Sequence, residues 1–211
     1  MTILRNVVAV LSNSFRPFLL MNLVYFGLVG AGMAYGAWDR SAPDAIRNEL
    51  KSEVPQQLPA VYDAYMGGHL ANAMVLTFAI NFFAGSLLFI TLPSLLLPFS
   101  GIALGATRAV YWGLMFSPTL TTLSFAHVAL GLLMAGLIML EGEGYVLAMV
   151  ASYVQGRSWL APARVGAASR WQGYKSGTWQ TFNIYALVAI VLAVAAVYEA
   201  TLVILVVPWL K

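Results

Sequence analysis

The chain has 211 residues, of which 61% are hydrophobic and only 9% are charged. An ordinary soluble domain carries about 25% charged residues, so this chain lacks the polar side chains needed to cover a water-facing surface. Its formal net charge of +3 gives no basic surface for a nucleic-acid partner. The absence of cysteine excludes disulfides, thiolate metal sites and cysteine nucleophiles.

Long apolar segments predict an all-α fold, a polytopic transmembrane helix bundle that forms a single membrane domain over residues 1–211. About 20 apolar residues are enough for a helix to cross the hydrocarbon core. Five to six such spans fit into the chain, separated by turns that contain proline or glycine. The expected spans lie at 17–38, 69–92, 101–116, 123–156 and 182–210.

Three segments hold most of the polar residues. Residues 1–16 are mildly amphipathic and predict an interfacial helix. Residues 39–67 begin with a helix-start signal at Ser41 and end in a glycine pair, which favours an extramembrane cap over the alternative of a solvated connector. Residues 157–180 are rich in Arg, Lys, Trp and Tyr, which is typical of a basic aromatic loop at the cytoplasmic boundary.

The distribution of positive charge sets the expected orientation. Arg5 and Arg16 favour a cytoplasmic N-terminus, and four cations within 157–175 place that loop on the same side. An even number of crossings must then separate the two, which favours five full spans. We therefore expect a multi-pass protein of the bacterial inner (cytoplasmic) membrane with its N-terminus in the cytoplasm.

The segment Glu141-Gly142-Glu143-Gly144 interrupts the longest apolar stretch. Two acids and two glycines at membrane depth predict a broken or re-entrant helix. Irregular backbone is tolerated at that depth only where it is buried in protein or lines water. Broken helices beside acidic residues also form binding sites in transporters.

Four ionisable residues form the expected intramembrane polar cluster, because a charge at membrane depth is costly and rarely faces lipid. They are Arg108, Glu141, Glu143 and Glu199. Arg108 is the expected counter-ion, and the two neighbouring glutamates should repel each other. A structural hydrogen-bonding role and a proton or cation site both remain open for this cluster.

Weaker hypotheses concern histidines and small residues. His69 and His127 lie near span ends and could ligate a haem-like group, but neither has a second ligand at metal-site spacing, so we expect no metal and no cofactor. Small residues let helices approach closely, and side-chain amides hydrogen-bond between helices. The expected helix-packing positions are Asn72, Gly85, Gly101 and Gly105.

Several of these positions resemble the stage II sporulation protein M family, the SpoIIM-like integral membrane proteins. The resemblance extends over residues 69–156 and 182–205 and depends on short, mostly apolar motifs. The residues that carry it are Asn72, Phe78, Gly85, Thr91, the Ser100-Gly101-Ile-Ala-Leu-Gly105 segment, Glu141, Ala148, Gly156 and the Ala195–Ala200 segment around Glu199. The chain departs from the family at Ser100, where asparagine is usual, and at Leu137-Ile138, where the family has His-Gly.

The resemblance implies a non-enzymatic scaffold or assembly subunit of a membrane complex. Its partners would be the lipid bilayer and other integral membrane proteins or further copies of itself. One alternative is a transport or permease subunit in which the four ionisable residues line an acidic path. The other is a membrane subunit that holds a cofactor through His69 or His127.

Overall fold

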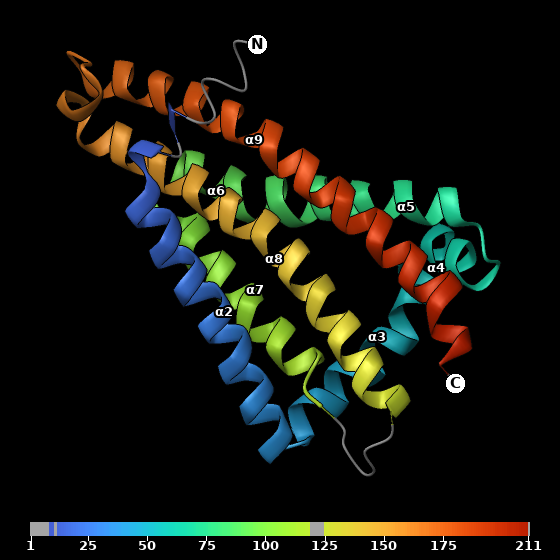
Figure 1. Cartoon of the computed structure of the whole chain (residues 1–211). Coiled ribbons are helices and arrows are strands. Elements are labelled where there is room, and N and C mark those ends of the chain that lie inside the picture. Colours follow the sequence, from blue (N-terminus) through green and yellow to red (C-terminus); the bar gives the residue numbers. More distant parts are fainter. Residues whose placement is uncertain (1–8, 11, 119–124, 211) are drawn as a thin grey trace.

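The computed structural model describes residues 9–10, 12–118 and 125–210, and this part of the chain is helical without strands. The predicted all-α class is therefore confirmed (Figure 1). Four helical segments are long and apolar enough to cross a membrane, which is compatible with a membrane protein. They are Phe15–Trp38, Leu70–Leu96, Ala126–Leu160 and Arg170–Trp209. The predicted interfacial helix over 1–16 lies mainly outside the described residues.

The first long helix, α2 (Phe15–Trp38), packs along α7 (Ser100–Met115). Glycines form the contact: a Cβ atom on Gly32 would lie 2.8 Å from the carbonyl oxygen of Val110 and 3.0 Å from the Cα atom of Gly113. Small residues thus let the two backbones touch, as expected for helices that associate without large side chains between them. With 16 residues, α7 is shorter than the four apolar segments, and the predicted count of five to six spans is not confirmed.

The second apolar segment changes its helix type midway. It begins as α5 (Leu70–Ala79), widens into the π-helix η1 (Ile80–Thr91) and ends as α6 (Leu92–Leu96). The buried residues of η1 recur every four to five positions, as the wider i→i+5 turn requires. They are Asn81, Gly85, Ser86, Ile90 and Thr91. π-helical turns are rare, and this segment packs against α8.

The polar segment at 39–67 folds into two short helices, α3 (Ser41–Gln57) and α4 (Pro59–Met66). Arg47 fixes α3 to the C-terminal end of α7. Its Nη2 donates to the carbonyl oxygen of Ser117 at 2.6 Å, and its Nε donates to that of Met115 at 3.2 Å. A cation at a helix C-terminus satisfies carbonyls that lack partners and complements the helix dipole.

The predicted break at Glu141–Gly144 is wrong, because α8 (Phe125–Leu160) is helical throughout. A glycine inside a helix costs only about 1 kcal/mol relative to alanine, which packing on both sides can offset. Gly142 lies against the rings of Tyr25 and Phe26, and Gly144 lies against Leu192. The two glycines are therefore close-packing positions.

Helix α9 (Arg170–Thr201) returns along α8, and this pair makes the most extensive helix contact in the fold. The predicted loop over 157–180 is shorter than expected: it contains the 3₁₀ turn η2 (Pro162–Val165), and both flanking helices extend into it. After α9 come a π turn, η3 (Leu202–Val206), and a 3₁₀ turn, η4 (Val207–Trp209). Figure 1 shows α3 and α4 at the end of the bundle opposite this connection.

Candidate functional site

Glu141 is buried in the middle of α8, with 2% of its surface exposed. Its Oε1 lies 2.8 Å from the hydroxyl of Tyr145, which stands one helical turn later and donates to it. The Nη2 of Arg108 lies 4.0 Å from the same oxygen and donates to the Tyr145 hydroxyl at 2.6 Å. The predicted pairing of Arg108 with an acid is thus present, but the tyrosine hydroxyl mediates it.

The Tyr145 hydroxyl also lies 3.1 Å from the Oδ1 atom of Asn81 on η1. A tyrosine hydroxyl has one proton, so it can donate to Glu141 or to Asn81 but not to both at once. The group thus has two alternative hydrogen-bond arrangements without any change of backbone. A proton arriving at Glu141 would shift this choice towards Asn81.

Aromatic rings cover the Arg108 guanidinium. Its carbon atom lies 4.0 Å from the ring centroid of Tyr145 and 5.3 Å from that of Trp112. Cation–π contacts of this kind stabilise a cation away from water. The two rings therefore stabilise the Arg108 guanidinium beside Glu141.

Glu199, near the end of α9, meets the cap helix α4. The hydroxyl of Tyr65 donates to Glu199 Oε1 at 3.2 Å and lies 2.7 Å from the Oγ1 atom of Thr77 on α5. Burial, and then the nearby Glu199 carboxyl, raises the pKa of the Tyr65 phenol far above its ordinary value. Tyr65 therefore stays a neutral donor to this acid over the whole physiological pH range.

Both acids, Glu141 and Glu199, line one cavity. It has a volume of about 230 Å³. We call it the acidic cavity; its wall comes from α3, α4, α5, η1, α7, α8 and α9. The residues that line it are Val54, Leu58, Val61, Tyr65, Thr77, Ile80, Asn81, Trp112, Met115, Phe116, Leu137, Glu141 and Glu199. At roughly 30 Å³ for each water molecule, it has room for several.

Glu143 does not join this group, so the predicted cluster of four is wrong in one member. Residues two apart on a helix do not face each other, and Glu143 therefore lies on the side of α8 that faces α2. The side chain of Asn22 on α2 is its hydrogen-bonding partner. The expected repulsion between Glu141 and Glu143 fails for the same reason.

Three of the four predicted packing residues lie inside the bundle. A Cβ on Gly85 would meet the Tyr145 hydroxyl at 3.0 Å, and one on Gly105 would meet the Met149 side chain at 2.5 Å. Gly101 is in direct contact with Ser152 and with the backbone of Ile90. Asn72 is exposed on α5, so its predicted packing role is wrong.

Both histidines are exposed and stand at or near the start of a helix, His69 before α5 and His127 in the first turn of α8. Within the described ranges, no group of three His, Cys, Asp or Glu residues is placed to hold a metal ion. Among the described residues, the acidic and hydrogen-bonding side chains therefore gather at the acidic cavity and not at either histidine.

Sequence reasoning missed the tyrosines that organise the site. Tyr145 follows Glu141 by four residues, which places the two side chains on one face of a continuous helix. The expectation of a break at that point hid this signal. Tyr65 and Thr77 come from segments that only the fold brings to Glu199, and no local pattern marks them.

No protein-family model, no curated protein and no solved structure matches this chain. The resemblance to SpoIIM-like proteins therefore depends on the residues that carry it.

Proposed function

We propose that this chain is a non-enzymatic membrane transport subunit that moves protons or small cations through the acidic cavity. The observation that carries the proposal is that one cavity is lined by two carboxyl groups from different helices, Glu141 and Glu199. Carboxyl groups at membrane depth are costly, and they mark ion pathways and proton relays in membrane proteins.

Polar groups near each acid support a transfer role. Glu141 is linked to Tyr145 and Asn81, and Glu199 is linked to Tyr65 and Thr77. Hydroxyl groups both donate and accept hydrogen bonds, so they can relay a proton to or from water in the cavity. Arg108 near Glu141 offsets the negative charge when the cavity is empty of cations.

We also propose that α7 forms a fifth crossing and that the N-terminus and the connection between α8 and α9 face the cytoplasm. The four cations at 157–175 support that orientation, since cytoplasmic segments are enriched in Lys and Arg. The acidic cavity, beneath the α3–α4 cap, would then open to the opposite side. The host membrane in this proposal is a bacterial inner membrane.

The scaffold role that the family resemblance implies is our second proposal, with integral membrane proteins or further copies of the chain as partners. It receives less support, because Gly101 and Gly105 are occupied by contacts within the chain. A cofactor-holding role receives the least support, because His69 and His127 do not line the acidic cavity.

Proton or cation flux into proteoliposomes tests the transport proposal. Glu141→Gln and Glu199→Gln should each abolish flux while the variants remain folded and monodisperse. Glu143→Gln is the matched control, because Glu143 lies two residues from Glu141 and does not line the cavity. Flux that survives both cavity substitutions, or that falls equally in the control, would contradict the proposal.

A further inference from the structure

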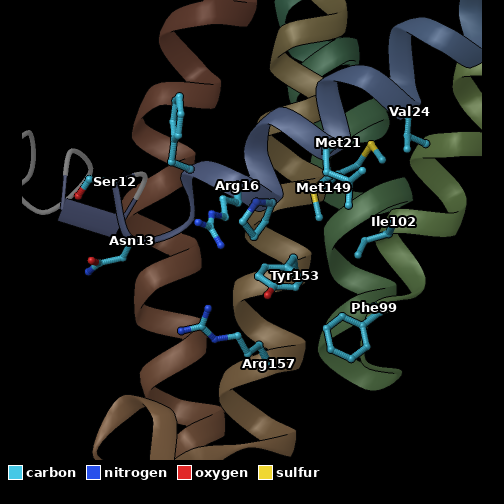
Figure 2. Close-up of a pocket in the computed structure, with 13 residues that line it drawn as sticks. Ser12, Asn13, Arg16, Met21, Val24, Phe99, Ile102, Met149, Tyr153 and Arg157 are labelled. Atoms are coloured by element: carbon cyan, nitrogen blue, oxygen red, sulfur yellow. The ribbon is translucent and has the colours of Figure 1, made fainter.

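A second, larger cavity opens at the other end of α8. It has a volume of about 980 Å³ and lies between α2, the start of α7 and the C-terminal half of α8 (Figure 2). We call it the basic groove, and its defining residues are Arg16, Leu20, Val24, Ile102, Met149 and Arg157. None of them contributes to the acidic cavity.

The groove is charged at one end and apolar along its length. Helix α2 runs from Arg16 to Val24, and α8 runs in the opposite direction from Met149 to Arg157, so the two arginines meet at the same end. Eight residues of helix rise about 12 Å, so an apolar wall of that length leads away from the charges. Figure 2 shows both guanidinium groups on one side of the groove, with Tyr153 between them.

No acidic side chain neutralises these arginines within the described part of the chain. The sequence has no Asp or Glu before Asp39, and none between Glu143 and Glu199. The ion pairs that the described residues form involve Arg47 and Arg108 only. The Arg157 guanidinium lies 6.0 Å from the ring centroid of Tyr153, a contact that leaves its hydrogen-bond donors available.

Phe99, between α6 and α7, adds an independent sign of a built site. Its φ of 67° lies in the left-handed region, which is unfavourable for a bulky side chain. Its ring lies 2.8 Å from the position that a Cβ atom on Gly156 would take, and it lines the groove. Strained backbone of this kind persists where surrounding structure fixes it, and it clusters at ligand sites.

We propose that the basic groove binds one anionic phospholipid, with its phosphate between Arg16 and Arg157 and an acyl chain along Leu20, Val24 and Met149. Two cations at one end match the phosphate, and the apolar wall matches hydrocarbon, which a free phosphate ion would leave uncovered. Basic pockets between transmembrane helices are suited to anionic headgroups. This inference is independent of the transport proposal.

Native mass spectrometry tests the site on the full chain, released from nanodiscs that contain equal amounts of phosphatidylglycerol and phosphatidylcholine. The wild-type chain should retain phosphatidylglycerol preferentially. The double variant Arg16→Gln/Arg157→Gln should lose about thirtyfold in that preference, since the two arginines near the surface together contribute about 2 kcal/mol and every 1.4 kcal/mol is a factor of ten. The matched control Arg164→Gln/Arg170→Gln removes two cations at the same end but outside the groove, and it should keep the preference.

A second variant keeps the test decisive if the double variant does not fold. Val24→Trp fills the apolar wall and leaves both arginines in place, so it should also lose phosphatidylglycerol. The proposal is overturned if the two lipids are retained equally, or if Val24→Trp retains lipid like the wild-type chain. Equal losses in the control and the groove variant would also overturn it, because they would indicate a diffuse electrostatic effect.

Discussion

The two halves of α8 carry ionisable groups in opposite ways. In the first half, Glu141 is surrounded by Arg108, Tyr145 and Asn81, which come from three helical segments. In the second half, Arg157 lines a groove without an acid beside it. The ionisable group at the centre of the bundle has its partners supplied by the chain, whereas the described residues give Arg157 at the end of the bundle no ion-pair partner.

The largest expected difference between the two regions appears when one arginine is removed from each. Arg108→Leu leaves Glu141 buried without its counter-charge and should lower the free energy of unfolding by about 3 kcal/mol or more. Arg157→Leu should change it by less than about 0.5 kcal/mol, since its side chain lies at the end of the bundle. Chemical unfolding in detergent, followed by circular dichroism, measures both values. Equal destabilisation would remove the distinction between the two regions.

A pair of tyrosines sharpens the comparison at the level of single hydroxyl groups. Tyr145→Phe removes the atom that contacts Arg108, Glu141 and Asn81, and should cost about 2 kcal/mol, as hydrogen bonds to charged groups do. Tyr153→Phe, one of the groove residues, should be nearly neutral, because its hydroxyl has no hydrogen-bond partner among the described residues. Thermal unfolding of both variants gives the difference, and a neutral Tyr145→Phe would show that the hydroxyl does not link the site.

Glycine-to-alanine substitutions test how tightly the helices pack next to each region. A Cβ on Gly101 would meet the carbonyl oxygen of Ile90, which is backbone and cannot move aside, so Gly101→Ala should cost about 1–3 kcal/mol. On Gly85 the obstacle is the end of the Tyr145 side chain, so Gly85→Ala should cost less. Gly27→Ala, with nothing within 4 Å, is the control and should stabilise α2 slightly. The reverse order of melting temperatures would contradict this packing.

The smallest expected effect concerns an exposed acid outside both regions. The Ser41 backbone N–H donates to Asp39 Oδ1 at 2.9 Å, and this hydrogen bond lowers the pKa of the Asp39 carboxyl. A lowered pKa in the folded state means that the stabilisation is present at neutral pH and is lost as the pH falls through that value. Asp39→Asn should therefore melt slightly lower than the wild type at neutral pH and equally in acid. A melting difference that persists in acid would show that the carboxylate charge is not its cause.

The sequence predicted the helical class, four of the five apolar segments and the proximity of Arg108 to Glu141, because each follows from local hydrophobicity or from the cost of a buried charge. It placed a break at Gly142 and Gly144, since a local pattern does not show that Tyr25 and Leu192 pack against these glycines. The cavity itself depends on the return of α4 over α5 and α9. Such contacts join residues far apart in the chain, so no local pattern predicts them.

The central claim is that the acidic cavity opens on the side of the α3–α4 cap. Side-specific labelling tests it most directly, because the chain has no cysteine of its own. Thr77→Cys lines the acidic cavity, Ile102→Cys lines the basic groove, and Val188→Cys lies in the fully buried core as a control. With a small, membrane-impermeant, cationic thiol reagent, we expect Thr77→Cys to react only from the side of the α3–α4 cap, and Val188→Cys to stay unreactive. A Thr77→Cys that stays unreactive from that side, or that reacts only from the side of the basic groove, would contradict the account.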